Sequence, residues 1–284
     1  MGRVIVATCQ FPVGGDLSAN ARAIRGLMRQ ARARGAQAAH FCETSLSGYA
    51  GVDIPTLEGY DWEKHAAELR GIMELAAELS LWVIVGSTHR LTGSRKPHNS
   101  LYIINNAGKM VTRYDKRFCT ASDLRHYTPG GAFTIFDIRG VRCGALICYD
   151  FRFPELYRAY CRRGVKLMFH SFHMAHGQPV PAEKNILGHI APASVFAHAA
   201  SNGMWISANN SSARVSRWST FVSRPDGMLS GRLPLHRTGM IVTSIDTTRA
   251  FYDAPGKNRD RALRGLLSSL PAVRDPRSRA RRAI

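Results

Sequence analysis

The alternation of strand-like and helix-like segments constrains the fold of this chain more than any other feature. Through the first ninety residues, short apolar runs alternate with longer segments in which apolar residues recur at helical spacing. The strand-like runs are 4–11, 36–43 and 81–89, and the helix-like segments between them are 17–34 and 62–79. Such alternation is typical of an α/β fold.

The second part of the chain is richer in strands. Residues 99–116 predict two strands joined by a tight turn at 105–108, which is a hairpin signal. A long helix is predicted at 186–202, and further strand-like runs lie at 141–147, 165–172, 203–211, 218–227 and 240–246. We expect the last three runs to close the sheet. Alternation followed by a strand-rich end predicts two sheets packed face to face with helices outside.

One domain accounts for nearly all of these segments. No Pro/Gly/Ser-rich linker interrupts the pattern, so we expect a single domain at 1–256. Residues 257–284 differ in composition, with nine Lys or Arg against two Asp. We expect this basic C-terminal extension to pack its leucines against the domain or a partner subunit, and its last ten residues to be mobile.

Cys148 lies where a strand gives way to a helix. In RCGALICYDFRFPELYR (142–158), a buried strand ends at Ile147, and Pro154 opens an amphipathic helix. A cysteine at such a turn faces the positive end of the helix dipole, which would lower its thiol pKa and suit a nucleophile. The alternative is a small apolar residue that only fills a turn.

Three segments together resemble the carbon–nitrogen hydrolase family, also called the nitrilase superfamily. ICYDFRFPELYR is similar to the family's nucleophile segment, Glu43 closes an apolar strand in AAHFCETSLSGYA, and Lys116 follows the hairpin. The order Glu43, Lys116, Cys148 is the family order, and the resemblance covers about residues 3–250. It implies a four-layer α–β–β–α sandwich of two mixed sheets with helices on both outer faces. It also implies a homodimer or a larger homo-oligomer.

These three residues can support amide hydrolysis through a thiol. The reaction needs a nucleophile, a base, an acid for the leaving amine and donors for the oxyanion. Cys148 is the candidate nucleophile, Glu43 the proton carrier and Lys116 the positive charge at the oxyanion, with the backbone N–H of Tyr149 as a second donor. The alternatives are a strand-end surface carboxylate for Glu43 and a solvated lysine for Lys116.

The sequence departs from the family pattern at two places. Many members carry a second catalytic glutamate seven positions before the glycine of a Pro-Gly pair, and Asp123 stands there in this chain. Asp123 either orients Lys116 or the attacking water, or lies outside the site. The family also commonly has Arg-Ala-x-Glu-Asn where this chain has His198 and Ser201, a departure that concerns packing more than catalysis.

Further residues are candidates for the substrate pocket. Arg152 can bind a substrate carboxylate bidentately, or it can form an ion pair with Glu155 at the helix start. The polar stretch 170–185, which contains His173, follows a strand on the side of Cys148 and is expected to line the pocket. Tyr49 either lines the pocket or belongs to the core.

No metal or cofactor is expected. His170, His173 and His176 are spaced by three, but the first two straddle a strand end and should diverge. The six cysteines show no CxxC or zinc spacing, so we expect a reduced, cytoplasmic protein. No apolar run approaches the roughly 18 residues of a membrane span.

The net charge of +19 favours anionic surfaces through nonspecific attraction. No nucleic-acid-binding signature accompanies it, so we expect a solvated basic face rather than a specific nucleic-acid partner.

The sequence therefore predicts an amidase acting on a small linear amide or carbamoyl C–N bond through a cysteine thioester, with release of ammonia or an amine. Its expected partners are a small-molecule substrate and further copies of itself, without a membrane. A nitrilase is the alternative inside the family, although true nitrilases more often follow the cysteine with Trp-Glu than with Tyr149-Asp150. A basic nucleic-acid-associated protein with a degenerate hydrolase fold is the alternative outside it.

Overall fold

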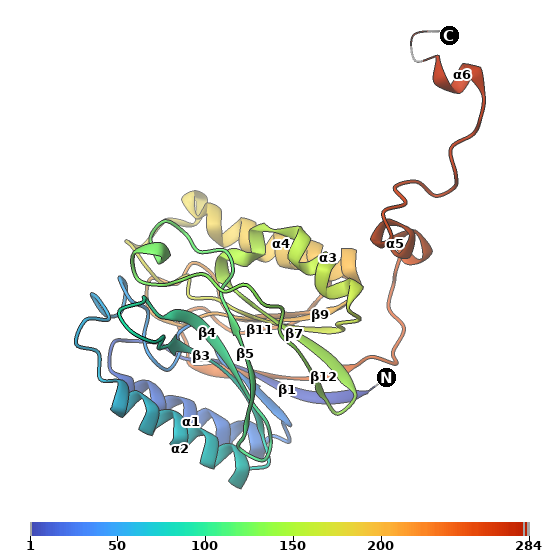
Figure 1. Ribbon diagram of the computed structural model, residues 1–284. Helices are drawn as coiled ribbons and strands as arrows, with labels where there is room; N and C mark the ends of the chain where they lie inside the picture. Colours follow the sequence, from blue (N-terminus) through green and yellow to red (C-terminus); the bar gives the residue numbers. More distant parts are fainter. Residues whose placement is uncertain (1, 281, 283–284) are drawn as a thin grey trace.

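Two six-stranded sheets face each other, and a pair of helices covers the outer face of each (Figure 1). A computed structural model describes residues 2–280 and 282 of the chain. The predicted four-layer α–β–β–α sandwich of two mixed sheets is confirmed.

The first sheet has the strand order β12-β1-β2-β3-β4-β5. Strands β1, β2 and β3 are parallel to one another, and the other pairs are antiparallel. Helices α1 and α2 connect the parallel strands and bury their apolar faces against the sheet. The bounds are β1 Arg3–Gln10, α1 Leu17–Ala33, β2 Ala38–His40, α2 Trp62–Glu78, β3 Trp82–His89, β4 His98–Ile104, β5 Met110–Asp115 and β12 Gly239–Asp246.

The second sheet has the order β11-β10-β9-β8-β7-β6, with β7, β8 and β9 parallel. Helices α3 and α4 cover its outer face (Figure 1). The bounds are β6 Ile135–Ile138, β7 Val141–Ile147, α3 Pro154–Arg162, β8 Leu167–Ser171, α4 Ile186–Asn202, β9 Trp205–Asn209, β10 Phe221–Ser223 and β11 Leu229–Arg232.

A buried histidine joins the two sheets through polar contacts. His40 in β2 is fully buried, and its two ring nitrogens lie 2.8 Å from the hydroxyls of Ser207 and Ser171 in the second sheet. Just beyond the strand ends, the Glu43 backbone N–H donates to the Phe172 carbonyl at 3.3 Å. The carboxyl ends of β2 and β8 therefore meet. Parallel sheets usually form their ligand-binding sites at this end of the strands.

The predicted helices and the hairpin are confirmed, but two short strands, β6 and β11, were not predicted. The prediction that 240–246 closes a sheet together with the two preceding runs was wrong. That run forms β12, which returns to the first sheet and pairs antiparallel with β1 along its whole length, from Arg3 opposite Asp246 to Gln10 opposite Gly239. The runs before it form β9 and β10 in the second sheet.

The C-terminal extension leads away from the sandwich (Figure 1). It contains α5 (Gly256–Leu263) and α6 (Pro276–Arg279). Leu267 is 88% exposed and Leu270 is 74% exposed, so these leucines do not pack against their own domain. Packing against a partner subunit stays a prediction, and the expected mobility of the last ten residues falls partly on 281 and 283–284, outside the described residues. Within the described part of the chain, no helix combines the length and apolar character that crossing a bilayer requires.

Candidate active site

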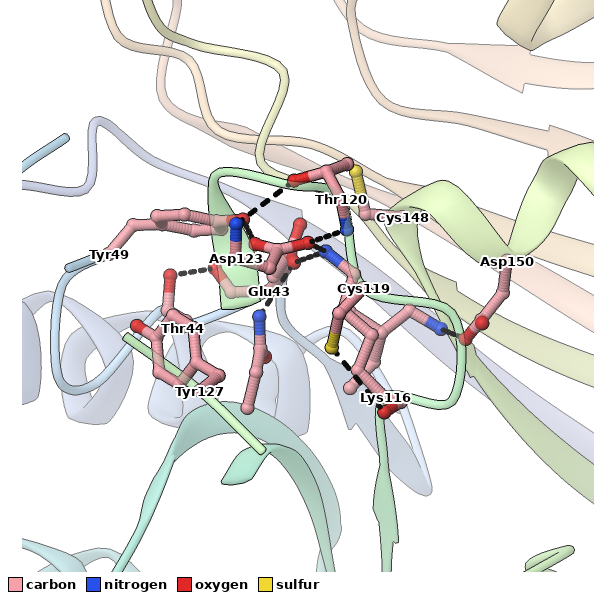
Figure 2. A network of polar contacts seen from close by, with 12 residues as sticks. Glu43, Thr44, Tyr49, Lys116, Cys119, Thr120, Asp123, Tyr127, Cys148 and Asp150 are labelled. Carbon is pink, nitrogen blue, oxygen red and sulfur yellow. Dashed lines mark hydrogen bonds and ion pairs between the residues drawn. The ribbon is translucent and has the colours of Figure 1, made fainter. Parts of the chain in front are cut away.

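The segments that follow three strands bring the predicted residues into one buried cluster (Figure 2). Glu43 lies three residues beyond the end of β2, Lys116 directly follows β5, and Cys148 directly follows β7. Asp123 opens a short 3-10 helix, η1 (Asp123–Arg125), in the loop after Lys116. Figure 2 shows the Glu43, Lys116 and Asp123 side chains converging beside the Cys148 sulfur.

Lys116 is the centre of the cluster. Its Nζ lies 2.8 Å from Glu43 Oε1 and 2.9 Å from Asp123 Oδ2, and only 1% of the side chain is exposed. Burial alone would lower the pKa of Lys116, but the negative groups around it, Glu43 foremost, raise that pKa well above its usual range. The ammonium is therefore charged, and the interpretation of Lys116 as a solvated lysine does not hold.

Glu43 is fully buried, with its two oxygens in different surroundings. Oε1 accepts hydrogen bonds from Lys116 and from Asn99 Nδ2, both at 2.8 Å, whereas Oε2 has no hydrogen-bond partner among the described residues. Gly86 in β3 passes directly beneath this turn, where a Cβ would lie 2.2 Å from the Cys42 carbonyl oxygen. The carboxylate is thus held by one oxygen, while its other oxygen is buried without a hydrogen-bond partner among the described residues.

Asp123 belongs to the same cluster. Besides its ion pair with Lys116, it accepts hydrogen bonds from the Tyr49 hydroxyl and, at 2.8 Å, from the Thr120 backbone N–H. Burial opposes ionisation, but the Lys116 charge and these hydrogen bonds outweigh it and lower the pKa of Asp123 below its usual value. The structure therefore brings Asp123 together with the other three residues.

Cys148 opens a 3-10 helix, η2 (Cys148–Arg152), which precedes the predicted α-helix. That helix, α3, begins at Pro154, as predicted. The prediction of a lowered thiol pKa was wrong. Burial, reinforced by the Glu43 charge, raises the pKa of the Cys148 thiol well above its usual value, although Lys116 opposes the change. A neutral thiol in this position needs a base to become a nucleophile.

Asp150 fixes the turn that carries Cys148. Its carboxylate accepts hydrogen bonds from the backbone N–H groups of Ile147 and Phe118, both at 3.0 Å, and from the Tyr114 hydroxyl at 2.8 Å. Burial raises its pKa to about 6 despite these hydrogen bonds. Because Phe118 lies two residues beyond Lys116, Asp150 ties the segment of the lysine to the segment of the cysteine.

Two members of the cluster, Lys116 and Cys148, line a cavity of about 340 Å³. The three residues predicted to contact substrate, Tyr49, Arg152 and His173, all line this cavity. Arg152 is exposed, its guanidinium lies 4.8 Å from the Phe151 ring centroid, and it forms no ion pair with Glu155. The apolar part of the wall comes from Val52, Tyr149, Phe151, Met174 and Leu187.

Two of the three histidines in the polar stretch have different hydrogen-bond partners. His170 contacts Tyr157 and the Cys148 carbonyl, and His173 Nε2 lies 2.6 Å from Asp53 Oδ2. The described residues contain no group of three or more His, Cys, Asp or Glu side chains that could hold a metal ion.

Sequence reasoning missed Asn99, Asp53 and Met174. Asn99 stands near the start of β4, Asp53 in a loop, and Met174 Sδ lies 3.7 Å from Cys148 Sγ. A polar residue at a strand start and an acidic residue in a loop are common, so neither gave a signal. Only the juxtaposition of distant segments shows their contribution.

Comparison with known sequences places these residues in context. The carbon-nitrogen hydrolase family profile matches residues 5–252. Nitrilase homolog 2 of Dictyostelium discoideum is 28% identical over 163 residues, which cover 49% of this chain and 49% of that protein. An omega-amidase of Bos taurus is 28% identical over 172 residues, which cover 57% of this chain and 61% of that protein. The chain thus spans about half to three fifths of the length of these relatives.

The fold itself recurs in solved structures. An amidase from Nesterenkonia sp. superposes with a TM-score of 0.76 at 19% sequence identity, covering 93% of this chain and 96% of that chain. At this level of identity the similarity shows a shared fold, the sandwich of the nitrilase superfamily.

Proposed function

The chain belongs to the carbon–nitrogen hydrolase family, as the resemblance of its three motifs predicted, and we propose that it is an amidase with Cys148 as its nucleophile. Its substrate is a small linear amide or carbamoyl compound, and the reaction passes through a thioester. The observation that carries this proposal is the buried Lys116 ion-paired to both Glu43 and Asp123 beside the Cys148 thiol. Such an arrangement costs desolvation energy that a purely structural core would avoid.

In the first step the Cys148 sulfur attacks the substrate carbonyl carbon, and the thiol proton passes to Glu43. The unpaired oxygen Oε2 is the natural acceptor, because Oε1 already accepts hydrogen bonds from Lys116 and Asn99. This transfer overcomes the raised pKa of the thiol. Glu43 thus acts as the general base.

Negative charge then develops on the former carbonyl oxygen. An ammonium group has three N–H donors, and Glu43 and Asp123 engage two of those of Lys116, so one remains for the oxyanion. The second donor is the backbone N–H of Tyr149. It occupies the second position of η2, where a helix supplies no internal partner.

The C–N bond breaks as Glu43 returns the proton to the leaving nitrogen, and ammonia or an amine departs. The acyl group remains on Cys148 as a thioester. Glu43 then takes a proton from water, which attacks the thioester, and the C–S bond breaks. The carboxylic acid leaves and the thiol is restored. Asp123 takes no proton in this scheme and holds Lys116 between the two carboxylates.

The cavity favours a short acyl chain. Its volume of about 340 Å³ and its mixture of apolar and polar walls suit a small molecule. We propose that Tyr49 and His173 contact the substrate and that Arg152, which has no carboxylate partner in the described residues, binds a distal carboxylate when the substrate carries one.

We also propose a cytoplasmic protein that assembles as a homodimer or larger. All six cysteines are free, as expected in a reducing compartment. The exposed leucines of the C-terminal extension offer an apolar surface for a second subunit.

Ammonia release from a panel of compounds tests the function. The panel contains butyramide, with which the Nesterenkonia amidase has been solved in complex, an ω-amide of a dicarboxylic acid, an N-carbamoyl amine and butyronitrile. We expect hydrolysis of at least one amide or carbamoyl compound, and none by the Cys148→Ala protein. Turnover of the nitrile alone would favour a nitrilase. No turnover, combined with retention on immobilised nucleic acid, would favour the degenerate nucleic-acid-associated protein.

A further inference from the structure

A buried histidine holds the peptide that links the nucleophile to the next residue. We propose that His170, oriented by Tyr157, is a positioning residue that turns the Cys148–Tyr149 peptide so that its N–H faces the substrate cavity. The catalytic part of this inference rests on the proposed amidase function, since it concerns the second oxyanion donor of that reaction. His170 lies in β8 and Tyr157 in α3, so two different elements contribute to the arrangement.

The backbone at Cys148 needs such support. Its φ is +43°, in the left-handed region that residues other than glycine rarely adopt. This conformation costs on the order of 1–3 kcal/mol and persists only where the surroundings enforce it. Contacts around the turn must therefore enforce it, and a hydrogen bond to the Cys148 carbonyl is one of them.

His170 supplies that hydrogen bond. Its Nε2 lies 3.2 Å from the Cys148 carbonyl oxygen. A carbonyl oxygen can only accept, so Nε2 carries the proton and Nδ1 is the acceptor. The Tyr157 hydroxyl, 2.7 Å away, donates to Nδ1 and thereby fixes this tautomer. Both side chains are fully buried, and burial holds the pKa of His170 well below its usual range, so the ring is neutral.

A second histidine steadies the same turn. His198 in α4 lies with its Nε2 3.1 Å from the Phe151 carbonyl oxygen, and its ring stacks on Tyr157 with centroids 4.0 Å apart. Phe151 is the fourth residue of η2, so both ends of the turn are held from the helix-covered side of the second sheet. His198 stands at a position where the sequence departs from the family pattern. Its hydrogen bond to the Phe151 carbonyl is what this residue contributes there.

The geometry of the peptide bond connects His170 to the reaction. The carbonyl of Cys148 and the N–H of Tyr149 belong to one planar trans unit, so they point in opposite directions. With the carbonyl directed at His170 in the buried sheet, the N–H is directed the other way, and Tyr149 lines the cavity. Rotation of this peptide would remove one of the two oxyanion donors without altering the Glu43 and Lys116 side chains.

A matched pair of substitutions tests the proposal. His170→Gln keeps a side-chain N–H at a similar reach, whereas His170→Met fills a similar volume without a donor. We expect His170→Met to lower kcat on the best amide by about 10²–10³, the usual loss for one oxyanion donor, with KM changed less than about threefold. His170→Gln should lose less than about tenfold. Tyr157→Phe removes the hydroxyl that fixes the His170 tautomer, so its kcat should lie between those of the wild type and His170→Met.

Crystal structures of the two His170 variants decide the structural part even if no amide proves to be a substrate. We expect Cys148 to leave the left-handed region in His170→Met and to keep it in His170→Gln. An unchanged Cys148–Tyr149 peptide in His170→Met would overturn the proposal whatever the activity. A rotated peptide with wild-type kcat would overturn the catalytic role. A wild-type protein without amidase activity would refute the proposed function, while the two structures would still show whether His170 sets the peptide.

Discussion

Lys116 Nζ lies 2.8 Å from Glu43 Oε1, and both side chains are almost completely excluded from water. Because the pair is buried, removing the Lys116 charge leaves the Glu43 carboxylate without a counter-charge, which costs about 3–5 kcal/mol. Asp123 adds a second carboxylate to the same ammonium. The three groups therefore form one electrostatic unit, and substitutions within it have to be interpreted together.

Substitution of the pair should abolish activity in a non-additive way. We expect Glu43→Gln and Lys116→Met each to lower kcat by at least 10³, because the first loses the base and the second the charged oxyanion donor. The double variant should be little worse than either single one, since residues that act as a unit lose their function together. Steady-state kinetics measures this.

Glu68→Gln and Lys109→Met are the matched controls. Glu68 forms a partly exposed ion pair with Arg25, and Lys109 lies exposed at the hairpin turn. Both controls should retain wild-type kcat. Fully additive losses in the Glu43 and Lys116 double variant, or near-normal kcat in either single variant, would refute the shared role.

Asp123→Asn should lower kcat by about 10–100-fold. The change keeps the size of the side chain but removes the charge that holds Lys116 on the side opposite Glu43, and charged hydrogen bonds are worth about 1.5–3 kcal/mol. Asp115→Asn is the control, because Asp115 pairs with the partly exposed Arg113. Equal kcat in the two variants would show that Asp123 does not contribute to catalysis.

Much of the fold could be predicted from local patterns. The two long helices of the first half and the strand-to-helix turn at Cys148 follow from apolar periodicity and from Pro154 at a helix start. The sheet to which 240–246 belongs could not be predicted, because β12 pairs with β1 and its partner lies more than 200 residues earlier. Strands of three or four residues, such as β11, are too short to show a period.

The site could be predicted only in part. Glu43, Lys116 and Cys148 were identified from three motifs, and Asp123 from its spacing to Gly130. The thiol pKa could not be predicted, because it depends on burial and on the Glu43 charge rather than on a helix terminus. The contribution of Asn99 depends on β4 passing beside the Glu43 turn, which no local pattern encodes.

The protein should lose stability as the pH falls below about 6.5. Burial lowers the pKa of His40 to about 3 and that of His65 to about 4, so the unfolded chain binds more protons than the folded one between these values and 6.5. The contribution of each histidine to the free energy of unfolding is complete above pH 6.5. Below pH 6.5 it declines by roughly 1.4 kcal/mol per pH unit until the pKa of the folded state is reached. Asp150, with its pKa raised to about 6, has the opposite sign and offsets one of them.

Urea unfolding at pH 7.5 and pH 5 measures this effect. We expect a lower midpoint at pH 5 for the wild type and a smaller pH difference for His40→Gln. His236→Gln, which alters an exposed histidine, should keep the wild-type difference. A midpoint that does not change with pH would contradict the burial of these histidines.

Deletion of the C-terminal extension should separate its two parts. Removal of 275–284 should leave kcat unchanged, because the described residues of this segment lie away from the catalytic cavity (Figure 1). Removal of 257–284 should lower stability or the oligomer mass, since it deletes the exposed leucines and Arg259, whose guanidinium pairs with Asp253. Light scattering and urea unfolding measure these effects. Loss of activity in the short deletion at unchanged oligomer mass would instead assign its arginines to substrate binding.

Detection of the acyl group on Cys148 tests the proposed thioester mechanism most directly. The wild-type protein is mixed with the best amide of the panel, quenched with acid during turnover and digested for peptide mass analysis. We expect the peptide containing Cys148 to gain the mass of the acyl group and no other cysteine-containing peptide to do so. Cys148→Ala should show neither the adduct nor ammonia release. Ammonia release by wild type and Cys148→Ala at equal rates, or an acyl group on a different cysteine, would contradict this mechanism.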